Sequence, residues 1–388
     1  MDFEWSQEDA RFREDLRAFL AAELPAQWEE ISKNGPGSDA QLDFSRHFCA
    51  RLAAHGWLTQ HWPAAYGGAD APPWRHAILG EEMWAAGEPR GSQYMNVNWI
   101  GPAIMQYGSE AQKALHLPRI SAGDVLWCQG FSEPNAGSDL ASLRTAARRE
   151  GAHFVVNGQK IWTSYCNKAE YCFLLVRTDP DSRRQRGISV LLMPMDLPGV
   201  EVREIPSVVG ERYFHEVFLT DVRVPVECLL GPENEGWDVV TYALAYERVG
   251  AARYARAALT LDAIAEHAQA SGRLADPAMQ EKLAAARGLC EAARLLSYRV
   301  IDLRAKGSPP TVDTNLARIA GTTADKLVGE LALEVFGSEA LAYDSFAASN
   351  FRLAMTAGVA VGATEVQRNL VASRWLGLPR EPRSGHRR

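Results

Sequence analysis

The sequence contains no run of about 20 apolar residues, the length that a membrane-spanning helix requires, so we expect no membrane span. Residues 1–5 are acidic and aromatic, without a positively charged stretch that leads into an apolar run. We therefore expect no targeting segment and a cytoplasmic location. Positive charge is not in excess either. The net charge of −7 argues against a nucleic-acid-binding surface, but a few local arginines would still suffice to bind an anionic ligand.

Cysteine is scarce and scattered through the chain. Six cysteines stand among 388 residues without a CxxC pair, so we expect neither a disulfide framework nor a metal site, and interpret them as buried, reduced thiols. A GxGxxG motif after a strand is also missing, so a bound dinucleotide must be held in another way. Apolar residues, in contrast, make up 47% of the chain, which is enough for the cores of two or three domains.

Three regions differ in the spacing of their apolar residues. Residues 1–123 are predicted to be helical, residues 124–235 to form short strands without helices between them, and residues 236–388 to be helical again. Strands in this pattern favour a barrel or a sandwich over a Rossmann unit. We predict an α+β multi-domain fold with an N-terminal α-helical domain, a central β-barrel and a C-terminal four-helix bundle.

Local signals refine this prediction. Ser6 begins a segment that resembles a capping box and is followed by apolar residues at helix spacing: Phe12, Leu16, Phe19 and Leu20. Asn157-Gly158 is a strong signal for a two-residue hairpin between two strands. The strands are expected at residues 125–131, 153–156, 159–161, 171–177, 187–193 and 216–219. Breaks between the C-terminal helices are expected near residues 271–272, 307–310 and 337–338.

Five segments of the sequence, in order and at matching spacing, resemble the acyl-CoA dehydrogenase family. They are residues 127–139 (WCQGFSEPNAGSD), 157–164 (NGQKIWTS), 218–225 (FLTDVRVP), 231–237 (GPENEGW) and 365–379, which contains EVQRN and LGLP. The resemblance implies a flavoprotein oxidoreductase of lipid metabolism. Such an enzyme desaturates an acyl thioester between Cα and Cβ with FAD: a Glu base removes the α-proton and hydride passes to flavin N5. The thioester carrier, CoA or an acyl carrier protein, is left open.

Two of these segments have the chemistry that a flavin ring needs. Phe131 and Trp162 can supply apolar contact, and Ser132 and Ser164 can donate hydrogen bonds to the polar ring edge. On their own these residues are more typical of an ordinary barrel core and its turns than of a flavin site. The family resemblance implies that the flavin contacts are Gln129, Phe131, Ser132, Gly137, Ser138, Trp162, Thr163, Ser164, Glu365 and Gln367. It also implies that Ser138 lies close to the CoA pantetheine or phosphates.

The catalytic base is identified by where this chain departs from the commoner family pattern. The usual Glu before a Gly-Thr pair is replaced by Val361, which is no base. The second location that the family uses corresponds to Glu247, followed by Arg248 on the CoA side. Glu247 interrupts an apolar stripe (Val240, Leu244, Ala251, Tyr254 and Ala258), and partial desolvation there would raise the pKa of its carboxyl. Val361 can still donate its backbone N–H to the thioester carbonyl and stabilise the developing enolate.

The resemblance also implies partners, namely an electron-transfer flavoprotein as acceptor and a tetrameric assembly. Relatives complete each FAD site with residues from a neighbouring subunit, among them an Arg and a Gln-Val-Phe-Gly-Gly segment. Here the Arg position is Ala268, and the segment reads EVFGS from Glu334 to Ser338. A heterotetramer in which a related chain supplies this half is therefore expected, unless Arg273 binds the diphosphate in a homotetramer. Alternative functions are a flavin-dependent monooxygenase or a partner subunit of a heteromeric dehydrogenase.

Overall fold

A computed structural model describes residues 5–33, 38–182, 184–209, 214–250, 252–308, 311–360 and 362–379, without the side chains of residues 33 and 245–250. The chain forms two compact units, residues 1–247 and 248–388. The finer domain boundaries that we predict, after residues 123 and 235, remain a prediction. No helix in the described ranges is long and apolar enough to cross a membrane.

The first unit opens with helices, as predicted. Ser6 accepts a hydrogen bond from the Asp9 backbone N–H and so caps the first helix, whose four predicted apolar residues are all buried. The segment between α3 and α4 is a loop with one 3₁₀ turn, η1, and η2 is a π-helical turn. The helical elements are α1 (Gln7–Glu23), α2 (Trp28–Lys33), α3 (Asp39–Ala54), η1 (Ala64–Tyr66), α4 (Pro73–Ala85), α5 (Gln93–Met95), η2 (Asn96–Ile100), α6 (Gly101–Tyr107) and α7 (Glu110–Ser121).

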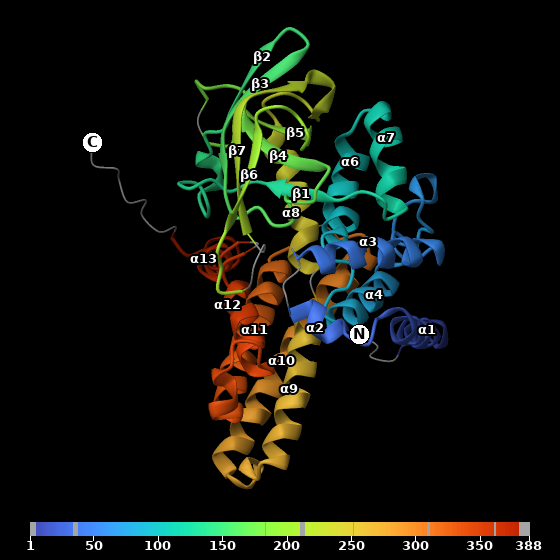
Figure 1. The fold of residues 1–388 in the computed structure, drawn as a ribbon, viewed down its shortest axis with the longest axis vertical. Helices are drawn as coiled ribbons and strands as arrows, with labels where there is room; N and C mark the ends of the chain where they lie inside the picture. Colours follow the sequence, from blue (N-terminus) through green and yellow to red (C-terminus); the bar gives the residue numbers. More distant parts are fainter. Residues whose placement is uncertain are drawn as a thin grey trace, which may run out of the picture. The chain divides into compact units, whose positions relative to one another are not determined.

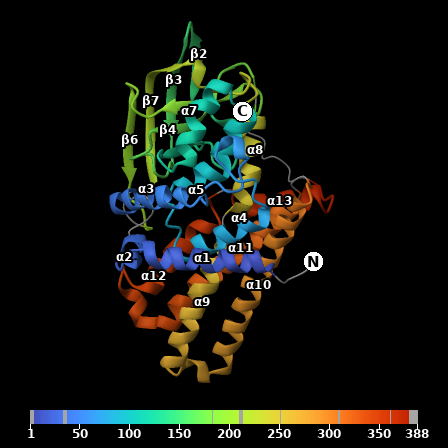
Figure 2. The ribbon, with the colours of Figure 1, turned by 90° about the vertical axis from the view of Figure 1, so that its right-hand side faces the viewer.

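Among the described residues of this unit, eight strands follow and form one sheet in the order β6-β7-β3-β2-β4-β5-β8, with β1 pairing with β4. Figure 2 shows the neighbouring strands β6, β7 and β3 of this sheet. One apolar core joins the helices to residues of β1, β4 and β5, and a second core lies among the strands. The strands are β1 (Trp127–Gly130), β2 (Ala146–Glu150), β3 (His153–Lys160), β4 (Tyr171–Arg177), β5 (Ile188–Pro194), β6 (Val200–Ile205), β7 (Phe214–Pro225) and β8 (Leu229–Leu230). Short turns η3 (Leu140–Ser142) and η4 (Val226–Cys228) interrupt them, and α8 (Gly236–Gly250) follows the last strand.

The predicted hairpin at Asn157-Gly158 is wrong. Both residues lie inside the single strand β3, where the register against β7 shifts at a bulge. Asn157 exchanges hydrogen bonds with Asp221 of β7, at 2.9 Å each. Gly158 has φ +155°, and a Cβ there would lie 2.5 Å from the Thr145 hydroxyl, so glycine is required for close packing rather than for a turn. The tight connection is instead made by residues 151–152, between β2 and β3.

An ion pair lies inside the sheet and is almost fully enclosed. The Lys160 Nζ atom at the end of β3 lies 2.8 Å from a Glu133 carboxylate oxygen, and the side chains are 1% and 9% exposed. The same carboxylate accepts hydrogen bonds from the backbone N–H groups of Arg144 and Thr145, at 2.7 and 2.8 Å. Burial alone raises the pKa of Glu133, but Lys160 and these donors outweigh it and hold that pKa below its usual value.

The cysteines are free thiols, and five of the six are buried, as predicted. Cys228 is the exception, being half-buried, and burial raises its pKa to about 11. Cys128 of β1 stands directly opposite Cys172 of β4, and burial raises the pKa of Cys128 well above its ordinary value. Neither Cys128 nor Cys228 therefore offers a reactive thiolate near neutral pH.

The second unit is a helical bundle in which α9 and α10 run side by side and pack against α11, with α12 beside α11 (Figure 1). Its helices end where the sequence predicts breaks. They are α9 (Arg253–Ala270), η5 (Arg273–Ala275), α10 (Pro277–Ala305), α11 (Asp313–Phe336), η6 (Gly337–Leu341), α12 (Phe346–Ala357) and α13 (Thr364–Arg374).

The single apolar stripe predicted from Val240 to Ala258 is wrong over that length. One helix, α8, ends at Gly250, and α9 begins at Arg253. The backbone of Ala252 leaves the helical region, with ψ 52°, so the spacing of three and four residues does not carry from α8 into α9. A Gly within an otherwise helical pattern is the sequence feature that marks the break.

Removal of the buried ammonium tests the Lys160–Glu133 pair. We expect Lys160→Met to lower the free energy of unfolding by about 3–5 kcal/mol, because Glu133 is left as an uncompensated buried charge. Adding Glu133→Gln should recover part of this loss. The control is Arg149→Met, which breaks the exposed pair with Glu233 and should cost under about 1 kcal/mol. Urea unfolding of the four proteins measures this, and equal losses in Lys160→Met and the control would contradict the analysis.

Acid should destabilise the first unit through His116. Its ring lies 5.1 Å from that of Trp127 and 4.9 Å from that of Tyr171, and burial, with Arg119 nearby, lowers its pKa to about 4. In the unfolded chain this histidine takes up a proton near pH 6.5, whereas in the folded chain it stays neutral until about pH 4. The free energy of unfolding is therefore highest above pH 6.5 and decreases as the pH falls toward 4. The loss should be on the order of 1–3 kcal/mol.

His116→Phe keeps an aromatic ring but removes the titration, so its stability should fall less steeply between pH 6.5 and pH 4. Denaturant melts at half-unit pH steps measure the slope. The control is His47→Asn, at an exposed position of α3. An unchanged slope in His116→Phe would assign the acid sensitivity to other groups.

Candidate active site

The two segments that are predicted to contact a flavin ring are held together by hydrogen bonds to backbone carbonyl groups. Ile161 N–H donates to the Ser132 carbonyl at 3.0 Å, and Lys160 Nζ donates to the Phe131 carbonyl at 3.2 Å. On the other side, Thr163 N–H donates to the His215 carbonyl at 3.0 Å. The end of β1 and the loop after β3, about 30 residues apart in sequence, therefore form one surface.

A tight turn fixes the next residues. Glu133 and Ala136 exchange backbone hydrogen bonds at 3.1 and 3.0 Å. The Glu133 carboxylate then anchors this turn to the start of β2. Gly137 and Ser138, which follow, are exposed, and no atom lies within 4 Å of where a Gly137 side chain would begin. This part of the segment is open to a ligand and is small enough for close backbone approach.

Trp162 is unusual in two respects. Its backbone has φ +60°, a left-handed conformation that is costly for a bulky residue, and its side chain is 55% exposed while its ring packs edge-on against Phe214. Tyr165, three residues on, also has a positive φ of 65°. Backbone strain of this kind concentrates at functional sites, where the surrounding structure enforces it. The half-exposed indole is the largest apolar side chain of this loop.

The other predicted residues of the first unit divide by exposure. Phe131 is 7% exposed and packs against Phe173 in the core, and Thr163 is fully buried. Gln129, Ser132 and Ser164 are half-buried. The structure thus brings the predicted residues of both segments together but gives them different surroundings: Phe131 and Thr163 belong to the interior, and Trp162 with the two serines faces outward or lies at the edge.

The other predicted site residues lie at position 247 and beyond. The side chains of Glu247 and Arg248, and all of Val361, lie outside the described residues. Glu365 is exposed in the first turn of α13. Gln367 is 1% exposed and accepts a hydrogen bond from Asn315 of α11 at 2.6 Å. The roles of all five in binding or catalysis remain predictions.

Comparison with known proteins identifies the fold. Models of the acyl-CoA dehydrogenase N-terminal, middle and C-terminal domains match residues 6–124, 128–222 and 234–376. The chain belongs to the acyl-CoA dehydrogenase family. The family, the fold class and the enzyme class inferred from the sequence are confirmed: this dehydrogenase is a flavoprotein oxidoreductase that acts on a CH–CH group of an acyl thioester.

The relatives span nearly the whole chain. This dehydrogenase is 32% identical to the acyl-CoA dehydrogenase IpdE1 of Mycobacterium tuberculosis, over 97% of this chain and 99% of that protein. Among solved structures it is similar to the Tcur3481-Tcur3483 steroid ACAD, with a TM-score of 0.89, 31% identity and coverage of 98% and 100%. The ChsE4-ChsE5 complex from Mycobacterium tuberculosis gives a TM-score of 0.87, 32% identity and the same coverage.

Sequence reasoning missed the residues that support the site. Lys160 stands in a quoted family segment, but nothing in its immediate sequence marks it as buried and paired with Glu133. A lysine on a strand that otherwise carries buried apolar residues is the signal that could have found it. Arg318 of α11, which binds the carbonyl groups of Ala357 and Ala360 close to Val361, gave no sequence signal of this kind.

Proposed function

We propose that this dehydrogenase binds FAD and introduces a double bond between Cα and Cβ of an acyl thioester, with Glu247 as the base. The observation that supports it best is the surface formed by the end of β1 and the loop after β3. That surface combines a strained, outward-facing Trp162 with the edge serines Ser132 and Ser164. Such an arrangement suits a flat ring that has an apolar face and a hydrogen-bonding edge.

The residues present fit a flavin. Trp162 would cover part of the ring, Ser132 and Ser164 would donate to its edge, and the exposed Gly137 and Ser138 would lie toward the thioester carrier. A bound flavin would supply the acceptor for the two electrons that leave Cβ. The hydrogen bonds from Ile161 N–H to the Ser132 carbonyl and from Lys160 Nζ to the Phe131 carbonyl keep these groups in place before any ligand arrives, which reduces the entropic cost of binding.

The proton on Cα requires a separate base. Val361 provides none, so the role falls to Glu247 in α8, the family's second location for this carboxylate. The base must reach the α-proton within hydrogen-bond distance of the substrate, while a backbone N–H in the 361 region binds the thioester carbonyl. An electron-transfer flavoprotein would then reoxidise the enzyme.

Anaerobic reduction by a panel of acyl thioesters tests the reaction. We expect the yellow protein to bleach with at least one CoA or acyl-carrier-protein thioester, and Glu247→Gln to keep its flavin but bleach about 10²–10⁴-fold more slowly. The control is Glu235→Gln, an exposed glutamate just before α8. Near-normal bleaching of Glu247→Gln would exclude this base. Rapid air oxidation with oxygen inserted into the substrate would instead favour the monooxygenase.

Residues of the second unit bear on how many and which subunits this dehydrogenase assembles with. Ala268, where relatives carry an arginine that completes a neighbour's FAD site, is fully buried on α9 and supplies no cation. Glu334 is paired with Lys282, whose Nζ lies 2.5 Å from its carboxylate, and a Cβ built on Gly337 would lie 3.3 Å from an Arg273 Nη atom. The solved Tcur3481-Tcur3483 and ChsE4-ChsE5 structures each carry the names of two chains. We infer a heterotetramer with a related subunit that supplies the diphosphate-binding half.

Flavin stoichiometry and native mass of the chain expressed alone decide between the two assemblies. We expect fewer FAD than chains, with full occupancy only after a related subunit from the same source is added. Arg273→Gln should leave that occupancy unchanged, since Arg273 has no phosphate role in the heterotetramer. One FAD per chain in an active homo-oligomer, lost on Arg273→Gln but not on Arg287→Gln in the exposed pair with Asp262, would establish the homotetramer instead.

A further inference from the structure

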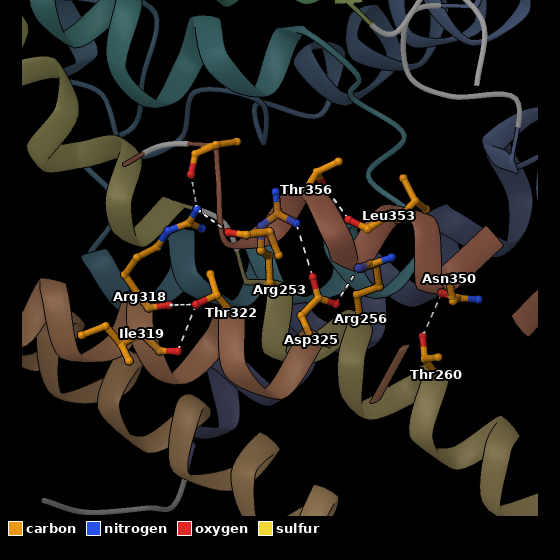
Figure 3. A network of polar contacts seen from close by, with 12 residues as sticks. Arg253, Arg256, Thr260, Arg318, Ile319, Thr322, Asp325, Asn350, Leu353 and Thr356 are labelled. Atoms are coloured by element: carbon orange, nitrogen blue, oxygen red, sulfur yellow. Dashed lines mark hydrogen bonds and ion pairs between the residues drawn. The ribbon is translucent and has the colours of Figure 1, made fainter. Parts of the chain in front are cut away.

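One face of α11 carries four polar side chains that are almost completely buried. Asn315, Arg318, Thr322 and Asp325 follow one another at intervals of three, four and three residues, so they share one side of the helix. Their exposed fractions are 6%, 6%, 2% and 3%. Buried polar groups are costly unless they are hydrogen-bonded, so their partners show which parts of the chain this face fixes. Figure 3 shows the contacts of Arg318, Thr322 and Asp325.

Arg318 holds the end of α12 and the loop that follows it. Its guanidinium donates to the Ala357 carbonyl at 2.9 Å and to the Ala360 carbonyl at 2.5 Å. The Ala357 carbonyl belongs to the C-terminal end of α12, where helix carbonyls lack partners and the helix dipole favours a cation, and the Ala360 carbonyl belongs to the loop that follows. The positive charge is buried with them, which makes each of these bonds stronger than it would be in water.

The far end of the same loop is held by the same helix. Asn315 Nδ2 donates to Gln367 Oε1 at 2.6 Å, and Gln367 Nε2 donates to the Gly362 carbonyl at 3.4 Å. Gly362 has φ +89°, and a Cβ there would lie 2.4 Å from Gln367 Nε2, so only glycine fits. The carbonyl groups of both neighbours of position 361 are therefore bound. Arg318 binds that of Ala360, and Gln367, which is held by a residue of α11, binds that of Gly362.

The remaining polar residues of this face serve other segments. Asp325 accepts from Arg256 at 2.5 Å and lies 3.4 Å from an Arg253 nitrogen, which ties the first turns of α9 to α11. Thr322 donates within its own helix, to the carbonyls of Arg318 and Ile319. Figure 3 shows Asp325 between the two arginines of α9, while Arg318 points toward the loop. Neither Asp325 nor Thr322 binds the loop carbonyls, so both serve as internal comparisons.

We propose that Arg318 is a positioning residue: by binding the carbonyl groups of Ala357 and Ala360 it fixes the start of the loop after α12, so that a backbone N–H in this loop is presented to the thioester carbonyl. This inference rests on the proposed desaturase function. The loop lacks the Glu side chain that other family members place there, so its contribution to the reaction is made by backbone geometry alone. Displacement of a backbone donor from the place where negative charge develops costs about 10²–10³-fold in rate, and partial misplacement costs less.

The variants are Arg318→Met, which removes both hydrogen bonds of Nη2, and Arg318→Lys, which keeps the charge but replaces the guanidinium with an ammonium. Amide hydrogen exchange across residues 358–364 reports on the loop directly, with or without substrate. We expect at least 10-fold faster exchange in Arg318→Met and an intermediate value in Arg318→Lys. Thr322→Val and Asp325→Asn, at equally buried positions of the same helix, should leave exchange in this loop unchanged even where they lower the melting temperature.

The second measurement is stopped-flow flavin reduction by the thioester that bleaches the wild-type protein most. Arg318→Met should lower the limiting reduction rate about 10–100-fold while the half-saturating thioester concentration stays within about 3-fold, because an N–H that acts on the developing charge affects the rate more than binding. Arg318→Lys should recover part of the rate. A role in stability alone would lower flavin content or melting temperature without this separation.

Three results would overturn the inference. They are unchanged loop exchange in Arg318→Met, faster loop exchange with a normal reduction rate, and equally fast loop exchange in Asp325→Asn. A wild-type protein that holds flavin but is reduced by no thioester would instead overturn the proposed function, and with it the role of Arg318 in the reaction. The exchange data distinguish the two cases, since they require neither substrate nor turnover.

Discussion

The ion pair between Lys160 and Glu133 is the interaction on which the first unit most depends. It joins the end of β3 to the turn that leaves β1, and the same carboxylate binds the backbone at the start of β2. Three segments that are distant in sequence thus meet at one buried charge. Since a buried carboxylate is tolerated only when its partners are all in place, the pair couples the closing of the sheet to the formation of the surface that we propose binds the flavin.

Much of the fold could be predicted from the sequence, because helices are marked by local signals. Ser6 caps α1, and the Gly- and Pro-rich stretches near 271, 307 and 337 end helices where expected. The hairpin predicted at Asn157-Gly158 is wrong because the same dipeptide also occurs at a bulge when the partner strand, here β7, comes from a distant part of the chain. The break after Gly250 was missed because a stripe of apolar residues continues across it in the sequence.

The site was predicted in part, for a related reason. The family motifs point to the residues that would touch a ligand, such as Trp162 and Ser164, because they stand together in the chain. The residues that hold those segments are brought to them by the fold. Lys160 binds Glu133, which is 27 positions away in the sequence, and Arg318 binds Ala360, which is 42 positions away. The spacing of apolar and polar residues along the sequence does not indicate such a pairing. The strained backbone of Trp162 is likewise a property of the folded loop and has no counterpart in the residue pattern.

The buried thiols have a practical consequence. Cys128 and Cys172 face each other across adjacent strands, and even the half-buried Cys228 has a raised pKa, so alkylating reagents that need a thiolate should leave the folded chain largely unmodified. A cysteine introduced on the surface could then carry a fluorescent or spin label without prior removal of the six natural ones. Slow modification of the natural thiols would in turn report each opening of the sheet and the bundle, which makes them built-in reporters of transient unfolding.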